Sequence, residues 1–461
     1  MLPFIARHVI CPIHELLLGR RTFHYVRELE RSQWLAPDDL RDLQRVKLTA
    51  LFRHAQADTA FYARRLADVG GDLIDANPFR VLTALPLLDK AAIRESIDEM
   101  LWRDAPGGLF CSSTGGSTGE PLMFYFDRRR QSYDQAARIR SRRWFGVDIG
   151  DRELYLWGSP IELNGSDAVR RLRDALFNHR LVSAFNMSPC RMDEYLDVWD
   201  RFRPVSLFGY PSSITLLAEH ARARGRKVDT RRLRAVFVTG EVCYPPQREA
   251  IALYFGVPVA DGYGSREAGF IAHQCPEGNM HLTAENIIVE IVDERGRPLA
   301  VGETGEIVVT HLDAYAMPLI RYRTGDVGRL RPGRCRCGRG LPMMDVVQGR
   351  TTDFLRFPDG DVKHALSIIY PLREMQGVRQ FRVTQYADYS VAVDVVRDDN
   401  ALRPTREAIA RRLRPVVGDQ VDLRVTLVPE IVSAESGKHR YVVSHARPST
   451  PGKIREAVAH A

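Results

Sequence analysis

Ala235-Val236-Phe237-Val238-Thr239-Gly240 decides the fold class of this chain. A short, continuous apolar run that ends at glycine is typical of a strand buried on both faces of a parallel sheet. Two similar runs precede it, Leu154 to Trp157 and Val205 to Gly209. The second of these leads into a helical pattern from Ser212 to Arg224. Strands that alternate with helices in this way predict an α/β fold with a mainly parallel sheet.

The pattern of apolar and polar residues differs on both sides of this α/β core. Residues 37–105 have the apolar spacing of helices, whereas residues 283–345 read as strands and turns that form a small antiparallel or barrel-like unit. From about residue 350 a compact α+β module follows. We therefore expect a large N-terminal domain over residues 1–350 and a small C-terminal domain over residues 351–461.

Composition excludes several classes of protein. With 461 residues, 44% hydrophobic and 27% charged, the chain is neither disordered nor fibrous. The net charge of +8 comes from Arg residues that are spread along the chain, so a nucleic-acid-binding module is not favoured. Seven cysteines, an odd number, argue for reduced thiols rather than a disulfide framework.

The sequence also bears on location. No apolar stretch is long enough to span a membrane, and no signal peptide is evident, so we expect a cytoplasmic protein. Residues 1–18 are apolar with Arg7, His8 and His14 among them. This segment could pack in the core, or lie as a helix on a membrane surface or on a partner. A homodimer is a further option that the sequence leaves open.

A loop rich in Ser, Thr and Gly is the first candidate for chemistry. Residues 112–119 hold three glycines and five hydroxyl residues, Ser112, Ser113, Thr114, Gly115, Gly116, Ser117, Thr118 and Gly119. Glycine lets backbone N–H groups converge on phosphate oxygens, and the hydroxyls add donors. By composition alone an exposed linker is an equal alternative. The apolar run Pro121 to Phe126 favours the phosphate loop, because a hairpin strand would anchor it.

The loop has no lysine, yet reaction at an α-phosphate needs a cation to offset developing charge. Lys438, in Ser436-Gly437-Lys438 of the C-terminal module, is a candidate for this role. Taken alone, a lysine in such a loop is more often a surface residue.

Five motifs, in order and spacing, resemble those of the adenylate-forming enzymes, and especially their phenylacetate–CoA ligase-like and CapK-like, or coenzyme F390 synthetase-like, branch. The motifs are Ser112 to Pro121, Asp261-Gly262-Tyr263-Gly264-Ser265-Arg266-Glu267, Tyr322-Arg323-Thr324-Gly325-Asp326, Gly349-Arg350-Thr351-Thr352-Asp353 and Ser436-Gly437-Lys438. The resemblance covers residues 40 to 440. It implies an ATP-dependent, AMP-forming acid–thiol ligase.

The resemblance also implies roles for single residues. Glu267 matches the glutamate that helps to hold Mg²⁺ on the triphosphate, and Asp326 and Arg350 match residues that reach the ribose. Tyr263 and Gly264 match the residues beside the adenine and the acyl pocket, and Lys438 matches the lysine that bridges the substrate carboxylate and the α-phosphate. The nucleotide site that it implies comprises Ser112, Ser113, Thr114, Gly115, Gly116, Ser117, Thr118, Gly119, Gly240, Glu241, Asp261, Tyr263, Gly264, Ser265, Asp326 and Arg350.

Individually these assignments have simpler alternatives. Asp326, after Thr324-Gly325, could merely cap a turn, and Glu267 could be a surface carboxylate. The sequence also departs from the family pattern at Arg266, where Ser or Thr is usual, and at Asp361 to His364, where phenylacetate enzymes are more apolar. The departure at Arg266 implies a substrate that differs from that of the phenylacetate enzymes, and the departure at residues 361–364 implies a different coenzyme A-facing surface. The resemblance further implies that Asp353 is the hinge of a mobile C-terminal domain.

Three cysteines and a histidine form a candidate metal site. Cys275, His281, Cys335 and Cys337 offer the thiolate and imidazole ligands of a closed structural Zn²⁺ site, although His273 could replace His281. Family members with a matching pattern are thought to bind zinc in this way, which strengthens the hypothesis. We expect this site to be structural and not catalytic.

The expected reaction has two half-reactions. A carboxylic acid attacks ATP to form an acyl-adenylate, and coenzyme A then displaces AMP. We expect the acid to bind at strand ends, near Trp157, Phe185, Tyr210, Thr239 and Gly240, although these aromatic residues could equally be core. One alternative is CapK-like transfer to an amine, a hydroxyl or a carrier thiol in polysaccharide or secondary-metabolite biosynthesis. Another is a non-catalytic nucleotide-binding or membrane-associated scaffold.

Overall fold

The computed structural model describes residues 2–113, 122–157, 167–184, 187, 189–345, 354–358, 362–364, 366–373, 375–397, 404–431 and 442–446. The chain divides into two compact units, Met1–Gln348 and Gly349–Ala461. No helix among these described residues is long and apolar enough to cross a membrane.

The first unit begins with helices. They are α1 (Pro3–Ile5), η1 (Ala6–Ile10), α2 (Cys11–Leu17), α3 (Thr22–Ser32), α4 (Pro37–Asp58), α5 (Ala60–Arg65), α6 (Gly71–Ala76), α7 (Pro78–Ala84), α8 (Lys90–Ser96) and η2 (Ile97–Met100). Side-chain caps set several starts: Thr59 accepts from the Tyr62 amide before α5, and Asp89 accepts from the Ala92 amide before α8. The helical region that the sequence predicts for residues 37–105 is present.

A nine-stranded sheet forms the centre of this unit, in the order β13-β14-β9-β8-β7-β6-β5-β3-β4. Its parallel half and the helices between its strands are β3 (Glu153–Trp157), α11 (Asp167–Leu176), β4 (His179–Ser183), α12 (Pro189–Phe202), β5 (Ser206–Gly209), α13 (Pro211–Ala223), β6 (Ala235–Thr239), α14 (Pro245–Phe255) and β7 (Val259–Ser265). The three apolar runs of the sequence are β3, β5 and β6, as predicted.

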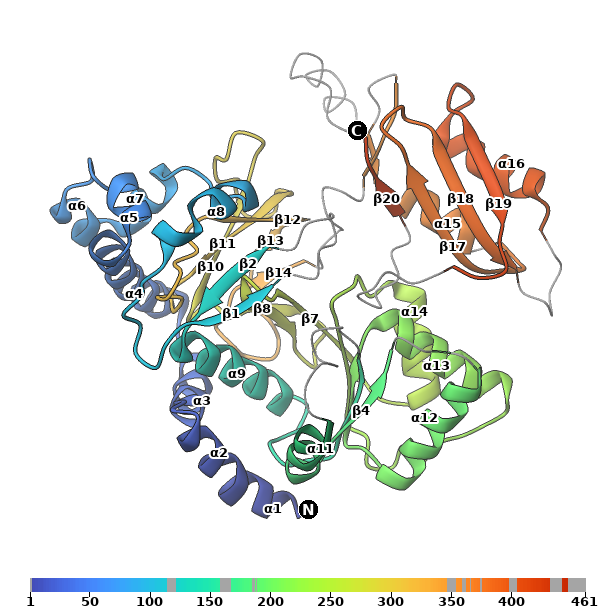
Figure 1. Ribbon diagram of the computed structural model, residues 1–461, viewed down its shortest axis with the longest axis horizontal. Helices are drawn as coiled ribbons and strands as arrows, with labels where there is room; N and C mark the ends of the chain where they lie inside the picture. The colour runs from blue at the N-terminus through green and yellow to red at the C-terminus, as the bar shows by residue number, and fades with distance from the viewer. Residues whose placement is uncertain are drawn as a thin grey trace. The chain divides into compact units, whose positions relative to one another are not determined.

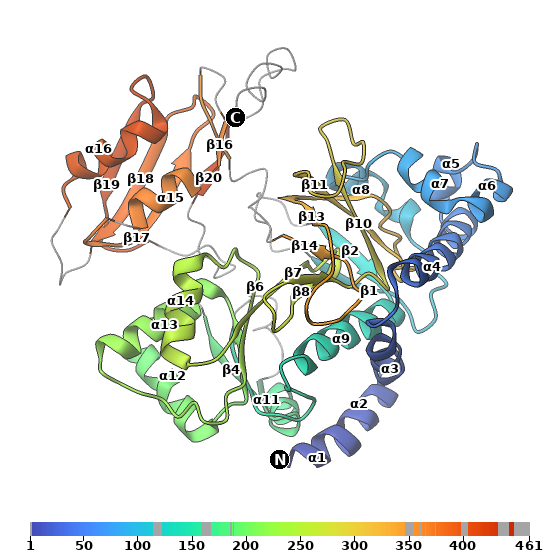
Figure 2. The ribbon, with the colours of Figure 1, turned by 180° about the vertical axis from the view of Figure 1, so that it is seen from behind.

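Helices cover both faces of the parallel strands. Helices α12, α13 and α14 lie together on one face (Figure 1), where Trp199, Leu217 and Ile251 pack on alternate residues of the strands. On the other face lies α9 (Arg128–Arg143), beside α3 (Figure 2). Because both faces are buried at the middle of the sheet, β6 is a continuous apolar run.

The other half of the large sheet is antiparallel, which the sequence did not predict. It is built from β8 (Gly269–Gln274), β9 (Met280–Leu282), β13 (Leu330–Arg331) and β14 (Met343–Met344). Three of these strands have only two or three residues, too few to show an alternating pattern. They extend the sheet because β7 continues into a hairpin with β8.

Two smaller sheets complete the first unit. Strands β10 (Ile287–Val292), β11 (Gly305–His311) and β12 (Tyr322–Gly328) form an antiparallel sheet, within the region where the sequence predicts a barrel-like unit. Strands β1 (Phe110–Ser113) and β2 (Met123–Phe126) form an antiparallel hairpin in which Ser113 pairs with Met123. The hairpin therefore anchors both sides of the Ser/Thr/Gly loop.

The second unit has its own α+β fold. Its elements are β15 (Phe354–Arg356), β16 (Val362–His364), α15 (Leu366–Arg373), β17 (Val378–Gln385), β18 (Val391–Arg397), α16 (Arg406–Val417), β19 (Leu423–Leu427) and β20 (Val442–Ser444). The larger sheet has the order β19-β18-β17-β20. Ile409, Leu413 and Val417 are the buried positions of α16, at the helical spacing that the sequence predicts.

Candidate active site

The β1–β2 hairpin is tied to the end of β7 by arginines. Arg266 lies directly after β7, and its Nη1 donates to the carbonyl oxygen of Ser113 at 3.4 Å. The carbonyl oxygen of Arg266 in turn accepts from Nη2 of Arg130 at 2.7 Å. The Arg130 guanidinium also lies over the ring of Phe124 in β2, 5.6 Å from its centroid. The fold therefore brings the end of β1, with Ser112 and Ser113, next to the Asp261 to Glu267 motif.

Glu267 is buried and held by a tyrosine. The residue is only 6% exposed, and Oε1 accepts a hydrogen bond from the hydroxyl of Tyr322 at 3.0 Å. Tyr322 is the first residue of β12 and is completely buried. Glu267 is thus not an ordinary surface carboxylate, because its orientation is fixed by a partner 55 residues along the chain.

Asp326 and Tyr263 form a second contact between the same motifs. The Tyr263 hydroxyl donates to Oδ2 of Asp326 at 3.0 Å, and the Asp326 amide donates to Oγ1 of Thr324 at 3.1 Å. Asp326 lies inside strand β12 and not in a turn. Alternation along this strand brings Tyr322, Thr324 and Asp326 to one face, which is the face that meets β7 and Glu267.

The glycines of the β7 motif have a steric reason. A Cβ atom at Gly264 would lie 2.4 Å from the carbonyl oxygen of Gly269, where the backbones of β7 and β8 approach each other. Only glycine fits there. The next residue, Ser265, closes the turn after β7, because its Oγ accepts from the Ala268 amide at 3.0 Å. This turn sets the position of Glu267.

Aromatic side chains surround the carboxyl ends of the neighbouring parallel strands. Trp157 at the end of β3 stacks on Tyr210 after β5, with ring centroids 4.1 Å apart. Gly240, which follows β6 with φ of +81°, leaves room for both rings, because a Cβ atom there would lie 3.2 Å from Tyr210 and 3.5 Å from Trp157. Thr239 Oγ1 donates to the carbonyl oxygen of Gly262 at 2.6 Å, which joins β6 to β7.

The carboxylate of Glu241 lies at the N-terminal end of helix α13. Its Oε2 accepts from the Ser212 amide in the first turn of α13, at 3.3 Å. The unsatisfied amides of a first turn and the positive end of the helix dipole favour a carboxylate at this place. Thus Gly240, Glu241, Trp157 and Tyr210 come together at the strand ends, where parallel α/β sheets usually bind ligands.

Asp261 carries a shifted pKa. It is buried in β7, and burial raises its pKa to about 7, against the attraction of Arg248, whose Nη2 lies 3.8 Å from Oδ2. His273 faces Gly262 across the β7–β8 pair, and burial keeps the pKa of its ring low, at about 4, so the imidazole is neutral. The carboxyl group of Asp261 therefore changes charge near neutral pH.

This shift predicts a pH-dependent gain in stability for Asp261→Asn. An unfolded aspartate titrates near pH 3.9, so between there and about pH 7 the folded chain binds more protons at this position than the unfolded chain, and stability falls as pH rises. Asp261→Asn has no carboxyl group to titrate at this position, so its stability does not fall in this way. Its free energy of unfolding relative to wild type should rise by about 2 to 4 kcal/mol between about pH 5 and pH 8. Urea unfolding of both proteins at each pH measures this difference in the free energy of unfolding. The same difference at both pH values would contradict the buried-carboxyl explanation.

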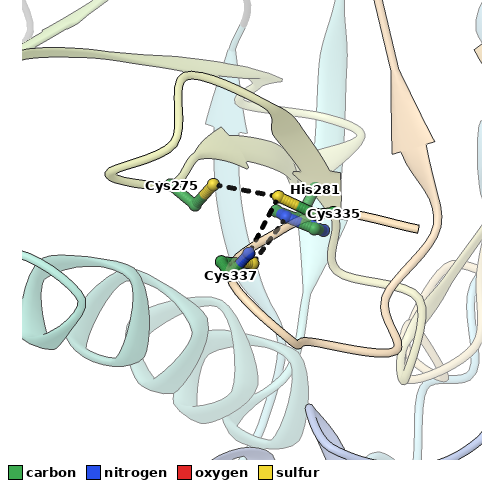
Figure 3. A group of neighbouring side chains, drawn as sticks. All are labelled: Cys275, His281, Cys335 and Cys337. Atoms are coloured by element: carbon green, nitrogen blue, oxygen red, sulfur yellow. Dashed lines mark hydrogen bonds between the residues drawn. The ribbon is translucent and has the colours of Figure 1, made fainter.

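The cysteine and histidine candidates meet in the antiparallel half of the large sheet (Figure 3). Cys275 follows β8, His281 lies in β9, and Cys335 and Cys337 lie in the turn between β13 and β14. Their four ligand atoms lie within 4.8 Å of one another. The Sγ atoms of Cys275 and Cys335 are 3.7 Å apart, and Cys337 Sγ is 3.3 Å from Nε2 of His281.

The surroundings orient these groups. Nδ1 of His281 lies 3.0 Å from the carbonyl oxygen of Leu341, an acceptor, so Nδ1 carries the proton and Nε2 faces the thiols with its lone pair. Nδ2 of Asn279 donates to Cys335 Sγ at 3.1 Å. His273, the alternative ligand, instead stacks on Phe270 and bonds to the carbonyl oxygen of Gln274. The donor set and its spacing fit a tetrahedral metal site.

Some predicted site residues lie outside the described part of the chain. These are Thr114, Gly115, Gly116, Ser117, Thr118 and Gly119 of the loop, Phe185 of the acyl pocket, and Arg350, Asp353 and Lys438. Their roles stay predictions.

Two residues of the site were not assigned from sequence. Tyr322 belongs to a motif but has no role assigned from sequence, and Arg130 belongs to none of the motifs. The signal for Tyr322 was its spacing, because in a strand it shares a face with Asp326. Arg130 gave no signal, since its contact with Arg266 joins residues 136 positions apart.

Comparison with known proteins gives a consistent picture. A family model described as "AMP-binding enzyme" matches residues 180–312. The phenylacetate–coenzyme A ligase of Thermus thermophilus is 27% identical over 91% of this chain and 99% of its own length. Protein CapK of Staphylococcus aureus is 22% identical over 93% of this chain and 94% of its own. The crystal structure of 2-hydroxyisobutyryl-CoA ligase with an acyl-AMP superimposes with a TM-score of 0.69 at 19% identity, over 90% of this chain and 91% of that chain.

Proposed function

The chain belongs to the AMP-binding, adenylate-forming enzymes, and from this premise we propose that it is an AMP-forming ligase that joins a carboxylic acid to coenzyme A. The observation that carries the proposal is the meeting of separate motifs in the first unit. Ser113 contacts Arg266, Tyr322 holds Glu267, and Tyr263 holds Asp326. These contacts place the residues expected to bind phosphate, metal and ribose around the end of β7.

In the first half-reaction a carboxylate oxygen of the acid bonds to the α-phosphorus of ATP, and the bond from that phosphorus to the pyrophosphate oxygen breaks. The products are an acyl-adenylate and pyrophosphate. We assign the loop of residues 112–119 to the phosphates and Lys438 to the charge that develops on the reacting oxygens. Asp326 accepts from the ribose hydroxyls, with its carboxylate fixed by Tyr263.

Glu267 fits the Mg²⁺ that accompanies ATP, because a buried carboxylate with one oxygen held by Tyr322 presents a hard ligand in a fixed orientation. When bound, Mg²⁺ neutralises phosphate charge. In the second half-reaction the thiol of coenzyme A attacks the acyl carbonyl carbon, its proton is released, and AMP leaves. We expect both steps in the cytoplasm, where these substrates are available.

The acid should have an apolar or aromatic body. Trp157 and Tyr210 stack at the strand ends beside Gly240, and aromatic side chains at a ligand site favour such molecules. A panel of aryl, short-chain and long-chain acids, tested by pyrophosphate exchange, would identify the class.

CapK-like transfer to another acceptor is the second candidate, and the similarity to CapK over 93% of the chain favours keeping it. The two candidates share the first half-reaction and differ in the second. AMP release in the presence of the acid and ATP separates them. Release that requires coenzyme A supports the ligase, whereas pyrophosphate exchange without coenzyme A-dependent AMP release supports another acceptor.

We also propose that Cys275, His281, Cys335 and Cys337 bind one structural Zn²⁺ that fastens the β13–β14 turn to the β8–β9 hairpin. Cys335→Ser should lose the metal and lower the midpoint of thermal unfolding by several degrees, because metal binding contributes to folding. Metal analysis and calorimetry measure both. Cys190→Ser, which alters an exposed cysteine outside the cluster, is the matched control. Wild-type protein purified without zinc, with unchanged stability in Cys335→Ser, would contradict the site.

The N-terminal helices offer a surface for anionic membranes. Along α1, η1 and α2 the side chains of Phe4, Leu16 and Leu17 are 70%, 79% and 80% exposed. Arg21 and Arg27 are exposed at the neighbouring α3 and supply positive charge. We propose peripheral contact of residues 1–18 with such a membrane. The homodimer, a separate matter, stays a prediction.

Vesicle flotation tests this contact. Leu16→Ser with Leu17→Ser should lower binding to anionic vesicles by at least about tenfold, since each leucine adds roughly 1.5 to 3 kcal/mol when buried. Leu253→Ser changes a leucine that is 75% exposed on α14 and should leave binding unchanged. Equal flotation of all three proteins would contradict the contact.

A further inference from the structure

A cavity of about 70 Å³ lies beneath the N-terminal helices, away from the candidate active site. Its walls come from α2, the start of α3, α9 and the first residues of β3 and β4, Glu153 and His179. The candidate active site is at the other end of these strands, where Trp157 ends β3. Four residue steps along a strand separate the two ends by about 13 Å. The cavity is therefore a separate place in the molecule.

One end of the cavity is cationic. Arg138 and Arg142, one turn apart on α9, both donate to the hydroxyl of Tyr155, at 2.6 and 3.5 Å. Arg142 also pairs with Glu153. Although burial opposes ionisation, the two guanidinium groups lower the pKa of the Tyr155 phenol. Burial and the same two cations lower the pKa of His179 to about 3, so its ring is neutral. Two cations therefore face one carboxylate.

The opposite wall is acidic and hydroxylic. Glu15 and Thr22 line it, and Glu15 lies near Arg20, with Oε1 3.5 Å from the guanidinium. Burial, followed by the charge of Glu15, raises the pKa of the neighbouring Cys11 thiol to about 12. The cavity is thus lined by two arginines and by the carboxylates of Glu15, Asp148 and Glu153, with Phe23, Ile139 and Phe177 among its apolar walls. Asp148 pairs with Arg7 and Arg143.

Three buried polar atoms of the lining residues have no hydrogen-bond partner within the described part of the chain: Nη2 of Arg142, Oγ1 of Thr22 and Oε2 of Glu15. Arg142 is 5% and Thr22 is 1% exposed. A buried polar group without a partner destabilises the folded protein, and native proteins rarely leave such groups unsatisfied. A ligand that satisfies all three must accept a hydrogen bond from Arg142 and donate one to Glu15.

We propose that this cavity binds a small carboxylic acid that carries a hydroxyl or ammonium donor. Its carboxylate lies at the Arg138 and Arg142 end, where a planar guanidinium matches a carboxylate. Its donor faces Glu15 and Thr22. A cavity of about 70 Å³ suits a small acid of a few heavy atoms.

Thermal unfolding at constant ionic strength tests the proposal with glycolate and glycine as probes, and with acetate and ethanol as controls that lack the donor or the carboxylate. Glycolate or glycine at millimolar concentration should raise the unfolding midpoint saturably, and more than either control. The larger of the two shifts tells whether the donor is a hydroxyl or an ammonium.

Variants locate the effect. Glu15→Gln and Thr22→Val, both close in size to the native side chains, should remove most of the shift while pyrophosphate exchange stays intact. Trp157→Ala, at the other end of β3, should keep it. Absence of a shift with both probes would mean that the cavity holds water only. A shift that is lost in Trp157→Ala and kept in Glu15→Gln would place the probe in the candidate active site. Either result overturns the proposal.

Discussion

Replacing Lys438 by alanine is expected to lower the rate of acid-dependent pyrophosphate exchange by about 10² to 10³-fold, the usual effect of removing one group that stabilises transition-state charge. Charge develops on the α-phosphate as the carboxylate attacks, and the loop of residues 112–119 contains no cation to offset it. The release of AMP from a preformed acyl-adenylate by coenzyme A should fall much less. In that step the bond between the acyl carbon and the phosphate oxygen breaks, and every bond to the α-phosphorus stays intact.

A matched variant makes this prediction specific. Lys453→Ala removes a second lysine of the C-terminal unit that belongs to none of the motifs, and it should retain the wild-type rate. Comparable exchange rates for Lys438→Ala and wild type would remove Lys438 from the mechanism. Equal losses in both lysine variants would point to general electrostatics rather than to one catalytic cation.

Glu267→Gln should produce the second large effect, a loss of about 10²-fold or more in kcat for adenylation at moderate Mg²⁺ concentration. Glutamine has the same size, and its amide oxygen can still accept the hydrogen bond from Tyr322. The variant therefore changes the charge of the ligand with little change in packing. Raising the Mg²⁺ concentration should restore part of the activity, because the loss concerns metal affinity.

Tyr322→Phe is the companion variant. It removes one hydrogen bond to a charged carboxylate, worth about 1.5 to 3 kcal/mol, so it should cost roughly 10- to 100-fold and shift the apparent Mg²⁺ affinity in the same direction. Titration of pyrophosphate exchange with Mg²⁺ measures both variants. Wild-type Mg²⁺ dependence in Glu267→Gln would show that this carboxylate does not serve the metal.

The parallel part of the fold was predictable from sequence because burial on both faces leaves a continuous apolar run, as in β6. Strand β12 was not, since Thr324-Gly325-Asp326 has the composition of a turn. It is part of a strand because β11 pairs with β12 on both sides of it, through Val308–Arg323 before it and Glu306–Val327 after it, with a shift of register between the two. A strand partner far away in the sequence decides whether such a segment forms a strand or a turn. Local composition does not reveal that partner.

The candidate site shows the same division. Motif spacing was enough to select Glu267 and Asp326, but the tyrosines that hold them are visible only when β7 and β12 are placed together. The choice of His281 over His273 was likewise open in the sequence. It follows from the register of the antiparallel strands, in which His281 pairs with Met343, near the Cys335 to Cys337 turn, while His273 pairs with Gly262.

Arg266 is the clearest case in which the structure adds a meaning to a departure from the family pattern. The sequence suggested positive charge near the phosphates or the substrate tail. In the structure its guanidinium contacts the backbone of Ser113, the residue at which the described part of β1 ends. Its described contact is thus with the strand that leads into the loop.

Pyrophosphate exchange, measured over a panel of aryl, short-chain and long-chain carboxylic acids with Mg²⁺ and ATP, tests the ligase proposal most directly. At least one class of acid should drive exchange of label from pyrophosphate into ATP, in the absence of coenzyme A and in dependence on Lys438. No exchange with any acid, from folded protein that binds ATP, would contradict adenylation and leave a nucleotide-binding scaffold.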